Sequence, residues 1–157
     1  MKIKLIQIGK TDESFISTGV TIYKERLQHY QRIEELTLKG PAIAAKQGVE
    51  IQKDAEGKGI LKSVSDSDYL ILLDEKGKQL TSVELANFFE KFSFSTTKTV
   101  VFCIGGAFGF SDAVYARADE KLSFSKFTLS HQMIRLFFWE QIYRAHTIIK
   151  REKYHHH

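Results

Sequence analysis

Three glycines follow a short apolar run in the stretch KTVVFCIGGAFGFSDAV, residues 98–114. Gly105 and Gly106 come directly after the run, and Gly109 precedes a pattern that is typical of a helix. Glycine lets a ligand approach the main chain without a Cβ in the way, and the start of a helix offers free N–H groups. Ligands of open α/β sheets bind beyond the carboxyl ends of the strands. The stretch is therefore either a ligand-binding loop or a tight strand-to-helix turn without a ligand.

Two well-known glycine loops do not fit these residues. A phosphate-binding P-loop needs a lysine after its last glycine, and no lysine follows Gly109 directly. A dinucleotide-binding loop has the order G-x-G-x-x-G after the first strand, whereas here the order is G-G-x-x-G and it comes late in the chain. The glycines alone do not decide between another ligand and none.

Polar side chains interrupt a second, strongly apolar stretch at residues 131–149. Glu140 and Arg144 are four residues apart, the spacing of an ion pair on one helix. An arginine in an apolar setting usually meets a carboxylate or a phosphate. A histidine at a helix start, such as His131, is more often a cap or a surface residue than a catalyst. The other polar residues of the stretch are Arg135 and Gln141.

The last eight residues, KREKYHHH at 150–157, form a polar tail. Their mixture of basic and aromatic side chains suits phosphate contact and stacking on bases. The final histidines also have the composition of an expression-tag remnant.

The elements that must position these residues alternate between strand and helix. The central strands are continuous apolar runs, which favour a mainly parallel sheet covered by helices on both faces. We expect one α/β domain over residues 1–157. Asp12 and Ser82 are the expected caps of the first two clear helices, residues 74–79 are expected to form a turn, and residues 41–64 a loop leading into a helix. The predicted strands are 2–8, 33–38, 69–73, 99–104 and 122–124, and the other helices are 12–30, 82–92, 111–118 and 131–149.

The final helix is apolar around nearly its whole circumference, so it must be buried on several sides. One of those sides is either another subunit or the centre of this chain's own core.

Composition sets outer limits on function. The 157 residues are 43% hydrophobic, enough for one domain with a core, and the net charge of +4 permits a phosphate-rich partner without requiring one. Cys103 is the only cysteine, which excludes an internal disulfide and a cysteine-based metal site, and its apolar setting predicts an inert thiol. The N-terminal apolar stretch is too short for a signal peptide and no segment has the length of a membrane span. We therefore expect a cytoplasmic protein with no membrane and no metal partner.

Several motifs occur together in one order: I-G-G-x-x-G at 104–109, L-S-F-S-K-F-T-L-S-H-Q-M-I-R at 122–135, E-Q-I-Y-R-A at 140–145 and Y-H at 154–155. M-K-I-x-L-I-x-I-G-K at 1–10, Y-x-x-R-L at 23–27 and L-x-x-x-G-K at 73–78 fit the same pattern. Over essentially its full length the chain resembles the small bacterial methyltransferases that modify N3 of a pseudouridine in 23S ribosomal RNA, members of the SPOUT superfamily.

The resemblance implies an α/β fold with a deep C-terminal trefoil knot, a homodimer, and S-adenosyl-L-methionine (AdoMet) as methyl donor. It also implies 23S rRNA, presented by an assembled ribosome, as substrate. Adenine fits an apolar slot such as Leu73, Ile104, Phe127 and Leu129 could form. The residues that the resemblance assigns to the cofactor are Leu73, Gly105, Gly106, Ser125, Lys126, Phe127, Thr128, Leu129 and Ser130.

The same resemblance places His131, Arg144, Tyr154 and His155 near the methyl transfer. Arg144 would hold the nucleotide or its phosphate, Tyr154 would pack against the base or the cofactor, and His155 or His131 would accept the proton. The tail would complete the site of a partner subunit.

The chain departs from the family at two places. Ser130 replaces the usual proline, and the tail reads Y-H-H-H where the family has a basic residue after Y-H. The alternatives are an RNA-binding protein on the same scaffold and a methyltransferase for another RNA, and the intact GGAFG and FSKFTLSH stretches favour an enzyme.

Overall fold

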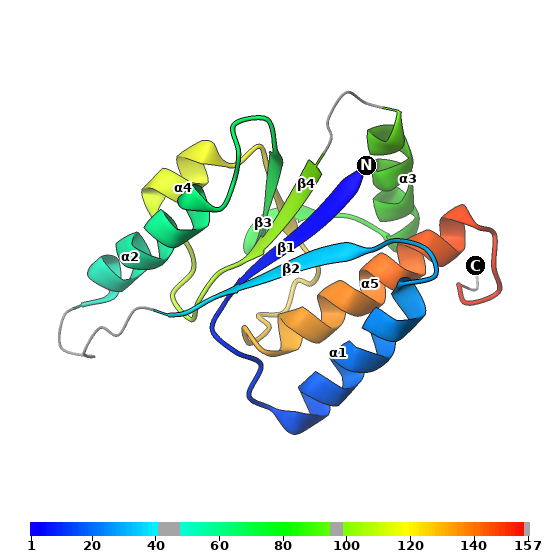
Figure 1. Cartoon of the computed structure of the whole chain (residues 1–157), viewed down its shortest axis with the longest axis horizontal. Coiled ribbons are helices and arrows are strands. Elements are labelled where there is room, and N and C mark those ends of the chain that lie inside the picture. Colours follow the sequence, from blue (N-terminus) through cyan, green and yellow to red (C-terminus); the bar gives the residue numbers. More distant parts are fainter. Residues whose placement is uncertain (41–47, 95–98, 156–157) are drawn as a thin grey trace.

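A five-stranded parallel sheet forms the centre of the molecule. The computed structural model describes residues 1–40, 48–94 and 99–155. The strands follow the order β2-β1-β4-β3-β5 and every neighbouring pair is parallel (Figure 1). The prediction of a mainly parallel sheet is therefore confirmed. The strands are β1 Lys2–Ile8, β2 Ile33–Leu38, β3 Tyr69–Gln79, β4 Thr99–Ile104 and β5 Glu120–Ser123.

Helices cover both faces of this sheet (Figure 1). One face packs against α1 (Ser14–Leu27), α3 (Ser82–Ser93) and α5 (Met133–Ile149). The other face packs against α2 (Val49–Lys62) and α4 (Asp112–Arg117). None of the helices in the described ranges is long and apolar enough to cross a membrane.

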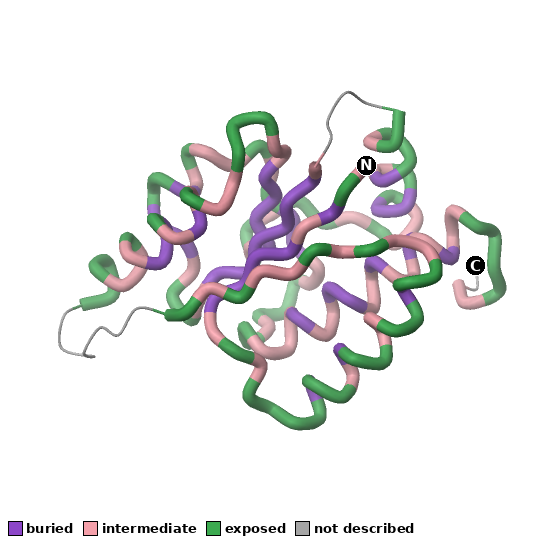
Figure 2. Tube along the Cα trace, viewed as in Figure 1, coloured by how far each residue is buried: buried purple, intermediate pink, exposed green. Residues whose placement is uncertain are grey.

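The two-sided cover explains why the central strands are continuous apolar runs. In β4, Phe102 belongs to the core beneath α1, α3 and α5, while its neighbours Val101 and Cys103 belong to the core beneath α2 and α4. All three side chains have no exposed surface, and the centre of the sheet is the most deeply buried part of the molecule (Figure 2). Alternate residues of a strand point to opposite faces, so a sheet covered on both faces needs apolar residues at every position.

Two of the predicted helix caps were wrong by one residue. The N-cap of α1 is Glu13, not Asp12, because the main chain of Asp12 instead donates a hydrogen bond to Gln132 Oε1 at 3.2 Å. The N-cap of α3 is Thr81, not Ser82. The Thr81 hydroxyl accepts from the N–H of Glu84 at 3.2 Å, and the Glu84 carboxylate accepts from the N–H of Thr81 at 2.7 Å. This reciprocal capping box fixes where α3 begins.

Residues 74–79 are part of strand β3 and not the predicted turn. Leu122 of β5 pairs with Leu73 and again with Lys78, so the residues between them bulge out of the ladder. A Cβ on Gly77 would lie 2.5 Å from the carbonyl carbon of Leu122, which is closer than two such atoms can come. Only glycine, which has no Cβ, fits at this position of the bulge. The bulge thus lets β3 run along β5 on both sides of Leu122. β5 itself spans Glu120–Ser123 where we predicted 122–124.

The remaining boundaries shift slightly. A helix does follow the predicted loop, as α2, while residues 41–47 lie outside the described residues. Ser111 is the N-cap of α4, so this helix spans 112–117 and not 111–118. α5 begins at Met133, two residues later than predicted, and Phe138 and Ile142 on it are fully buried in the core of this chain.

Candidate active site

A cavity of about 710 Å³ lies where β4 ends and where β3 enters its bulge. Leu73, the last residue before the bulge, and Ile104, the last residue of β4, are paired neighbours, and both line the cavity. A volume of this order suits a drug-sized organic ligand. Three chain segments supply most of the wall: residues 73–76, residues 104–110, and residues 122–131 without Lys126. The helices α2, α4 and α5 contribute one side chain each, which are Lys53, Tyr115 and Ile134.

The glycine stretch forms a tight turn in the wall of this cavity. The N–H of Gly109 donates to the carbonyl oxygen of Gly106 at 3.2 Å, and Gly109 has φ +78°. A Cβ on Gly105 would lie 3.2 Å from both the Gly109 carbonyl oxygen and the Phe110 ring. Glycine is needed at Gly109 for its conformation and at Gly105 for this close approach. The glycine stretch is therefore a tight turn that is also part of the cavity wall.

A second loop, between β5 and α5, faces the glycine turn across the cavity. Its conformation is fixed by hydrogen bonds from Ser123 Oγ to the carbonyl oxygen of Ser125 at 2.7 Å and from Phe127 N–H to Ser125 Oγ at 2.9 Å. Thr128 Oγ1 donates to Glu75 Oε2 at 3.1 Å, which ties the loop to β3. The loop is thus attached at its base and at its middle.

Ser130 ends this loop and replaces the proline that the resemblance predicts. Its hydroxyl accepts a hydrogen bond from the N–H of Met133 at 3.1 Å. This N–H belongs to the first turn of α5, where main-chain donors lack partners within the helix. The serine therefore stabilises the helix start that follows the loop.

The predicted cofactor residues gather around the cavity with one exception. Lys126 is exposed and does not line it. His131, predicted to act in the transfer, lies at the cavity as well. The predicted residues that line the cavity are Leu73, Gly105, Gly106, Ser125, Phe127, Thr128, Leu129 and Ser130.

Polar side chains that the sequence reasoning missed also reach the cavity. Tyr115 donates to Asp74 Oδ2 at 2.5 Å, and Asp74 Oδ1 accepts from the N–H of Lys76 at 2.8 Å. Burial and this hydrogen bond to Asp74 raise the pKa of Tyr115 to about 12, so its hydroxyl stays protonated. Asp74 stands directly after a buried strand, a position from which the sequence could have suggested it. Tyr115 has no such signal.

Buried Arg135 fixes the start of α5 beside the cavity. Only 1% of its surface is exposed, and its Nη2 donates to the carbonyl oxygen of Ile8 at 2.7 Å. Its Nη1 donates to Thr11 Oγ1 at 2.9 Å, and Gln132 Nε2 donates to the carbonyl oxygen of Lys10 at 3.0 Å. These bonds attach the start of α5 to the end of β1. They therefore also hold the segment just before α5, which contains His131.

The other predicted catalytic residues meet at the far end of α5. Arg144 Nη2 lies 2.5 Å from Glu140 Oε1, which confirms the predicted ion pair. Tyr154 donates to the same oxygen at 3.0 Å, its hydroxyl lies 3.2 Å from that of Tyr23, and the Arg144 guanidinium lies 4.7 Å from its ring centre. We call Tyr23, Glu140, Arg144 and Tyr154 the tail cluster.

The tail cluster keeps its charges paired. Burial alone would lower the pKa of Arg144, but the hydrogen bond and charge of Glu140 outweigh it and raise that pKa. Burial, together with hydrogen bonds to Tyr23 and Glu140, raises the pKa of Tyr154. Arg144 is thus a fixed cation and Tyr154 a neutral hydroxyl at neutral pH.

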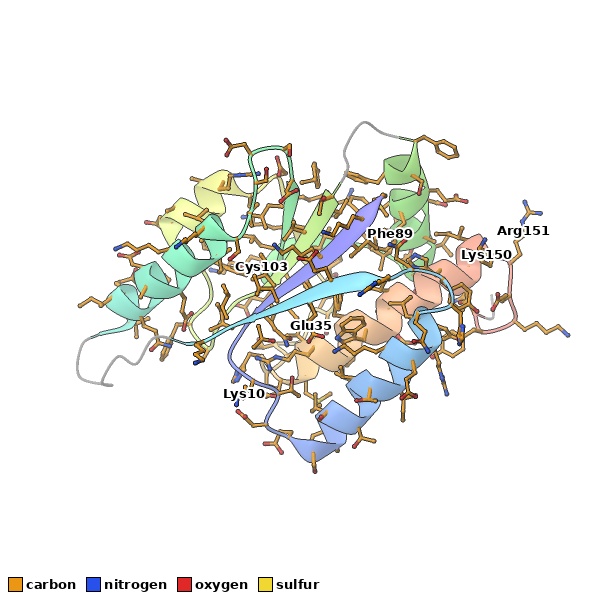
Figure 3. The ribbon with its side chains drawn as sticks, viewed as in Figure 1. Lys10, Glu35, Phe89, Cys103, Lys150 and Arg151 are labelled. Carbon is orange, nitrogen blue, oxygen red and sulfur yellow. The ribbon has the colours of Figure 1, made fainter. Side chains whose placement is uncertain are left out.

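A hydrogen bond from Tyr30 to Glu152 Oε2, at 2.5 Å, holds the tail next to this cluster. His155 follows Tyr154 and is half-buried, while Lys150 and Arg151 point away from the ribbon (Figure 3). His156 and His157 lie outside the described residues.

The cavity and the tail cluster are far apart in one chain. Thirteen residues separate His131 from Arg144, and most of them belong to the α5 helix. At 1.5 Å per residue this is roughly 20 Å. The structure therefore brings Arg144 and Tyr154 together, with His155 beside them, and leaves His131 at the cavity. The part of the chain that the structure describes holds no group of three His, Cys, Asp or Glu side chains able to bind a metal ion.

The fold and the cavity define an α/β protein with a parallel sheet and a cavity of ligand size at the carboxyl end of β4. Residues 1–155 match the model of a family described as predicted SPOUT methyltransferase, and the chain belongs to that family.

Relatives are similar over the whole chain. Ribosomal RNA large subunit methyltransferase H of Parabacteroides distasonis is 49% identical over 156 residues, which are 99% of each chain. Proteins of the same name from Cytophaga hutchinsonii and Christiangramia forsetii are 48% and 47% identical over the same length, 99% of this chain and 100% and 99% of theirs.

Proposed function

We propose that this chain is an AdoMet-dependent methyltransferase that modifies N3 of a pseudouridine in 23S rRNA. The observation that carries the proposal is the similarity to rRNA methyltransferases over 99% of the chain, together with a cavity at the site where the family resemblance puts the cofactor. We further propose that it acts on assembled ribosomes in the cytoplasm.

The cavity fits AdoMet in size and in chemistry. Leu73, Ile104 and Leu129 give apolar walls for adenine, and the main chain of the glycine turn lines the cavity beside them. Asp74 and Glu75 add carboxylate oxygens that suit hydroxyl and ammonium donors. When bound, AdoMet supplies an electrophilic methyl group on a sulfonium sulfur.

The protein's own contribution is to orient the nucleotide and to manage one proton. N3 of pseudouridine carries a hydrogen, so N3 must lose a proton as it gains a methyl group. His131 at the cavity, or His155 in the tail, accepts that proton at a ring nitrogen. Arg144, held as a cation by Glu140, binds the phosphate or the base oxygen of the nucleotide.

A homodimer reconciles the two separate groups of residues. The cavity and the tail cluster lie roughly 20 Å apart along α5, too far for one nucleotide to touch both in one chain. A partner packed in antiparallel fashion would bring its tail cluster to this chain's cavity. Each dimer would then have two composite sites.

The trefoil knot is part of the same proposal. The family resemblance implies it, and the close approach of the main chains at Gly77 and Leu122, where β5 pairs with β3 on both sides of the bulge, is compatible with a tightly packed C-terminal region.

Labelled AdoMet tests the function directly. Ribosomes and free rRNA from a host that lacks this modification are offered to the purified protein, and the labelled nucleotide is identified by mass spectrometry. We expect label at N3 of one pseudouridine in the large-subunit RNA, mainly when ribosomes are the substrate. Label in another RNA would contradict the substrate, and AdoMet binding without transfer to any RNA would contradict the enzyme.

A further inference from the structure

A buried carboxylate lies beneath the glycine turn. Glu56 on α2 is only 5% exposed, although glutamate is rarely buried without a partner. Its Oε1 accepts a hydrogen bond from Gln52 Nε2 at 2.9 Å. In the described ranges, no lysine, arginine or histidine forms an ion pair with it. Burying a carboxylate costs free energy, so we looked for what Glu56 contributes at this position.

Glycine at the next position brings Glu56 close to the turn. A Cβ on Gly57 would lie 2.3 Å from Ser111 Oγ and 3.2 Å from a Val114 methyl group. Because Ser111 is the N-cap of α4 and is itself 2% exposed, the surroundings have little room to move. Gly57 therefore lets α2 approach the start of α4 more closely than any residue with a side chain would allow.

The Glu56 carboxylate occupies the space beside Gly106 where a side chain would begin. A Cβ on Gly106 would lie 2.5 Å from Oε2 and 2.9 Å from Oε1 of Glu56. Gly106 is also the residue whose carbonyl oxygen closes the turn with Gly109. Gly106 thus closes the turn through its carbonyl oxygen, and its Cα packs against the Glu56 carboxylate.

We infer that Glu56 is a positioning residue for the cofactor site. It does not line the cavity, but its buried side chain supports the Gly105–Gly109 turn that does. Glu56 supports the turn by filling space and by accepting a hydrogen bond from Gln52. A side chain of the same size that also accepts from Gln52 should therefore be able to replace Glu56. This inference rests on the proposed AdoMet site, because it assigns Glu56 to holding that ligand's wall in place.

The first test measures AdoMet affinity by calorimetry, and KM and kcat with ribosomes. Glu56→Ala should raise the Kd and the KM for AdoMet about tenfold, equal to about 1.4 kcal/mol, while kcat changes far less. Glu56→Gln should keep both within about twofold of wild type. The matched control is Asp54→Ala, on the same helix with an exposed carboxylate, which should leave Kd unchanged.

A double-mutant cycle makes the contact itself measurable. Gly106→Ala in the natural background should weaken AdoMet binding because the new Cβ meets the Glu56 carboxylate. In the Glu56→Ala background the same change should lose most of its effect, since the obstructing atoms are gone. Glu56→Gln, which fills the same space, should keep the penalty of Gly106→Ala.

The outcomes separate the inference from the proposed cofactor. AdoMet binding by the wild type with equal affinity in Glu56→Ala, or with additive effects in the cycle, would overturn the role of Glu56 and leave the cofactor proposal intact. A Glu56→Gln variant as weak as Glu56→Ala would also overturn it, because the charge and not the shape would then matter. A wild type that binds no AdoMet would overturn both.

Discussion

The cavity and the tail cluster are built in opposite ways. The cavity uses glycine main chain, apolar walls and short loops tied to the sheet by single hydrogen bonds, such as that from Thr128 to Glu75. The tail cluster uses charged and aromatic side chains that bond to one another, with Glu140 Oε1 shared by Arg144 and Tyr154. The first region offers a shape and the second a fixed charge.

This difference indicates a division of labour. A cofactor with a rigid adenine ring is best held by a preformed, mostly apolar slot. A phosphate or a base oxygen that gains charge during transfer is best met by a cation whose orientation is already fixed. Under the proposed function each region would do half of the chemistry, which is why the distance between them matters. Two experiments test the division and two more measure stability around the tail cluster and in the core, from the largest expected effect to the smallest.

Arg144→Ala should lower kcat/KM for methylation about 100-fold, because the change removes a preorganised cation from the reacting nucleotide. AdoMet affinity should stay near that of wild type, since Arg144 does not line the cavity. Methylation assays and calorimetry check the two parts. Arg144→Lys should fall between, as it keeps the charge without the planar fork. The control is Lys62→Ala, an exposed cation on the opposite face of the sheet. An equal loss of AdoMet affinity would mean that the two regions are not separate.

A heterodimer of two defective chains should recover activity. One chain carries Arg144→Ala, and the other carries Gly105→Val, whose Cβ would press on the Phe110 ring. With differently tagged chains purified as a mixed dimer, one of the two composite sites is intact, so we expect about half of wild-type activity. Each homodimer should be nearly inactive. A mixed dimer without activity would show that cavity and tail cluster of one chain work together.

Tyr154→Phe should lower the free energy of unfolding by about 1 kcal/mol, because it removes hydroxyl contacts with Glu140 and Tyr23. Urea titration measures it. Tyr30→Phe is the matched control, since its hydroxyl donates to the exposed Glu152 and should matter less. Equal effects would indicate that the tail cluster is no more rigid than the rest of the tail.

Because of His146, the free energy of unfolding should decrease as the pH is lowered. Burial lowers its pKa, so the unfolded chain binds the proton more readily than the folded one. Stability is therefore complete above the unfolded pKa of about 6.5 and decreases as the pH falls through that value. Urea midpoints at about pH 7.5 and about pH 5.5 should differ less in His146→Phe than in the wild type. An identical difference would assign the acid sensitivity to other groups.

Local patterns in the sequence predicted much of the fold. The apolar runs of β1, β3 and β4 predicted the parallel sheet, since a strand buried on both faces must be apolar throughout. The extension of β3 to Gln79 was missed because it depends on pairing with β5, more than forty residues later. The start of α3 was misplaced because Thr81 and Ser82 are both good caps, and only the reciprocal bond with Glu84 selects between them.

The candidate site shows the same limit. The glycine turn and the loop before α5 could be predicted because their residues are consecutive. Two contacts could not be predicted, that of Glu56 with Gly106 and that of Tyr115 with Asp74, because the residues of each pair are far apart in the sequence. The spacing predicted the pair of Glu140 and Arg144, but only the folded chain shows that Tyr154 joins it through Glu140 Oε1.

The buried thiol of Cys103 makes the chain a convenient reporter of its own opening. It is the only cysteine, lies among the central strands with no exposed surface, and burial raises its pKa (Figure 3). A thiol reagent can therefore modify it only when the sheet separates, so the modification rate measures the frequency of that event. Because the native thiol is buried, a cysteine introduced at the exposed position of Lys126 would be the single reactive one. A fluorophore or a spin label can be attached there.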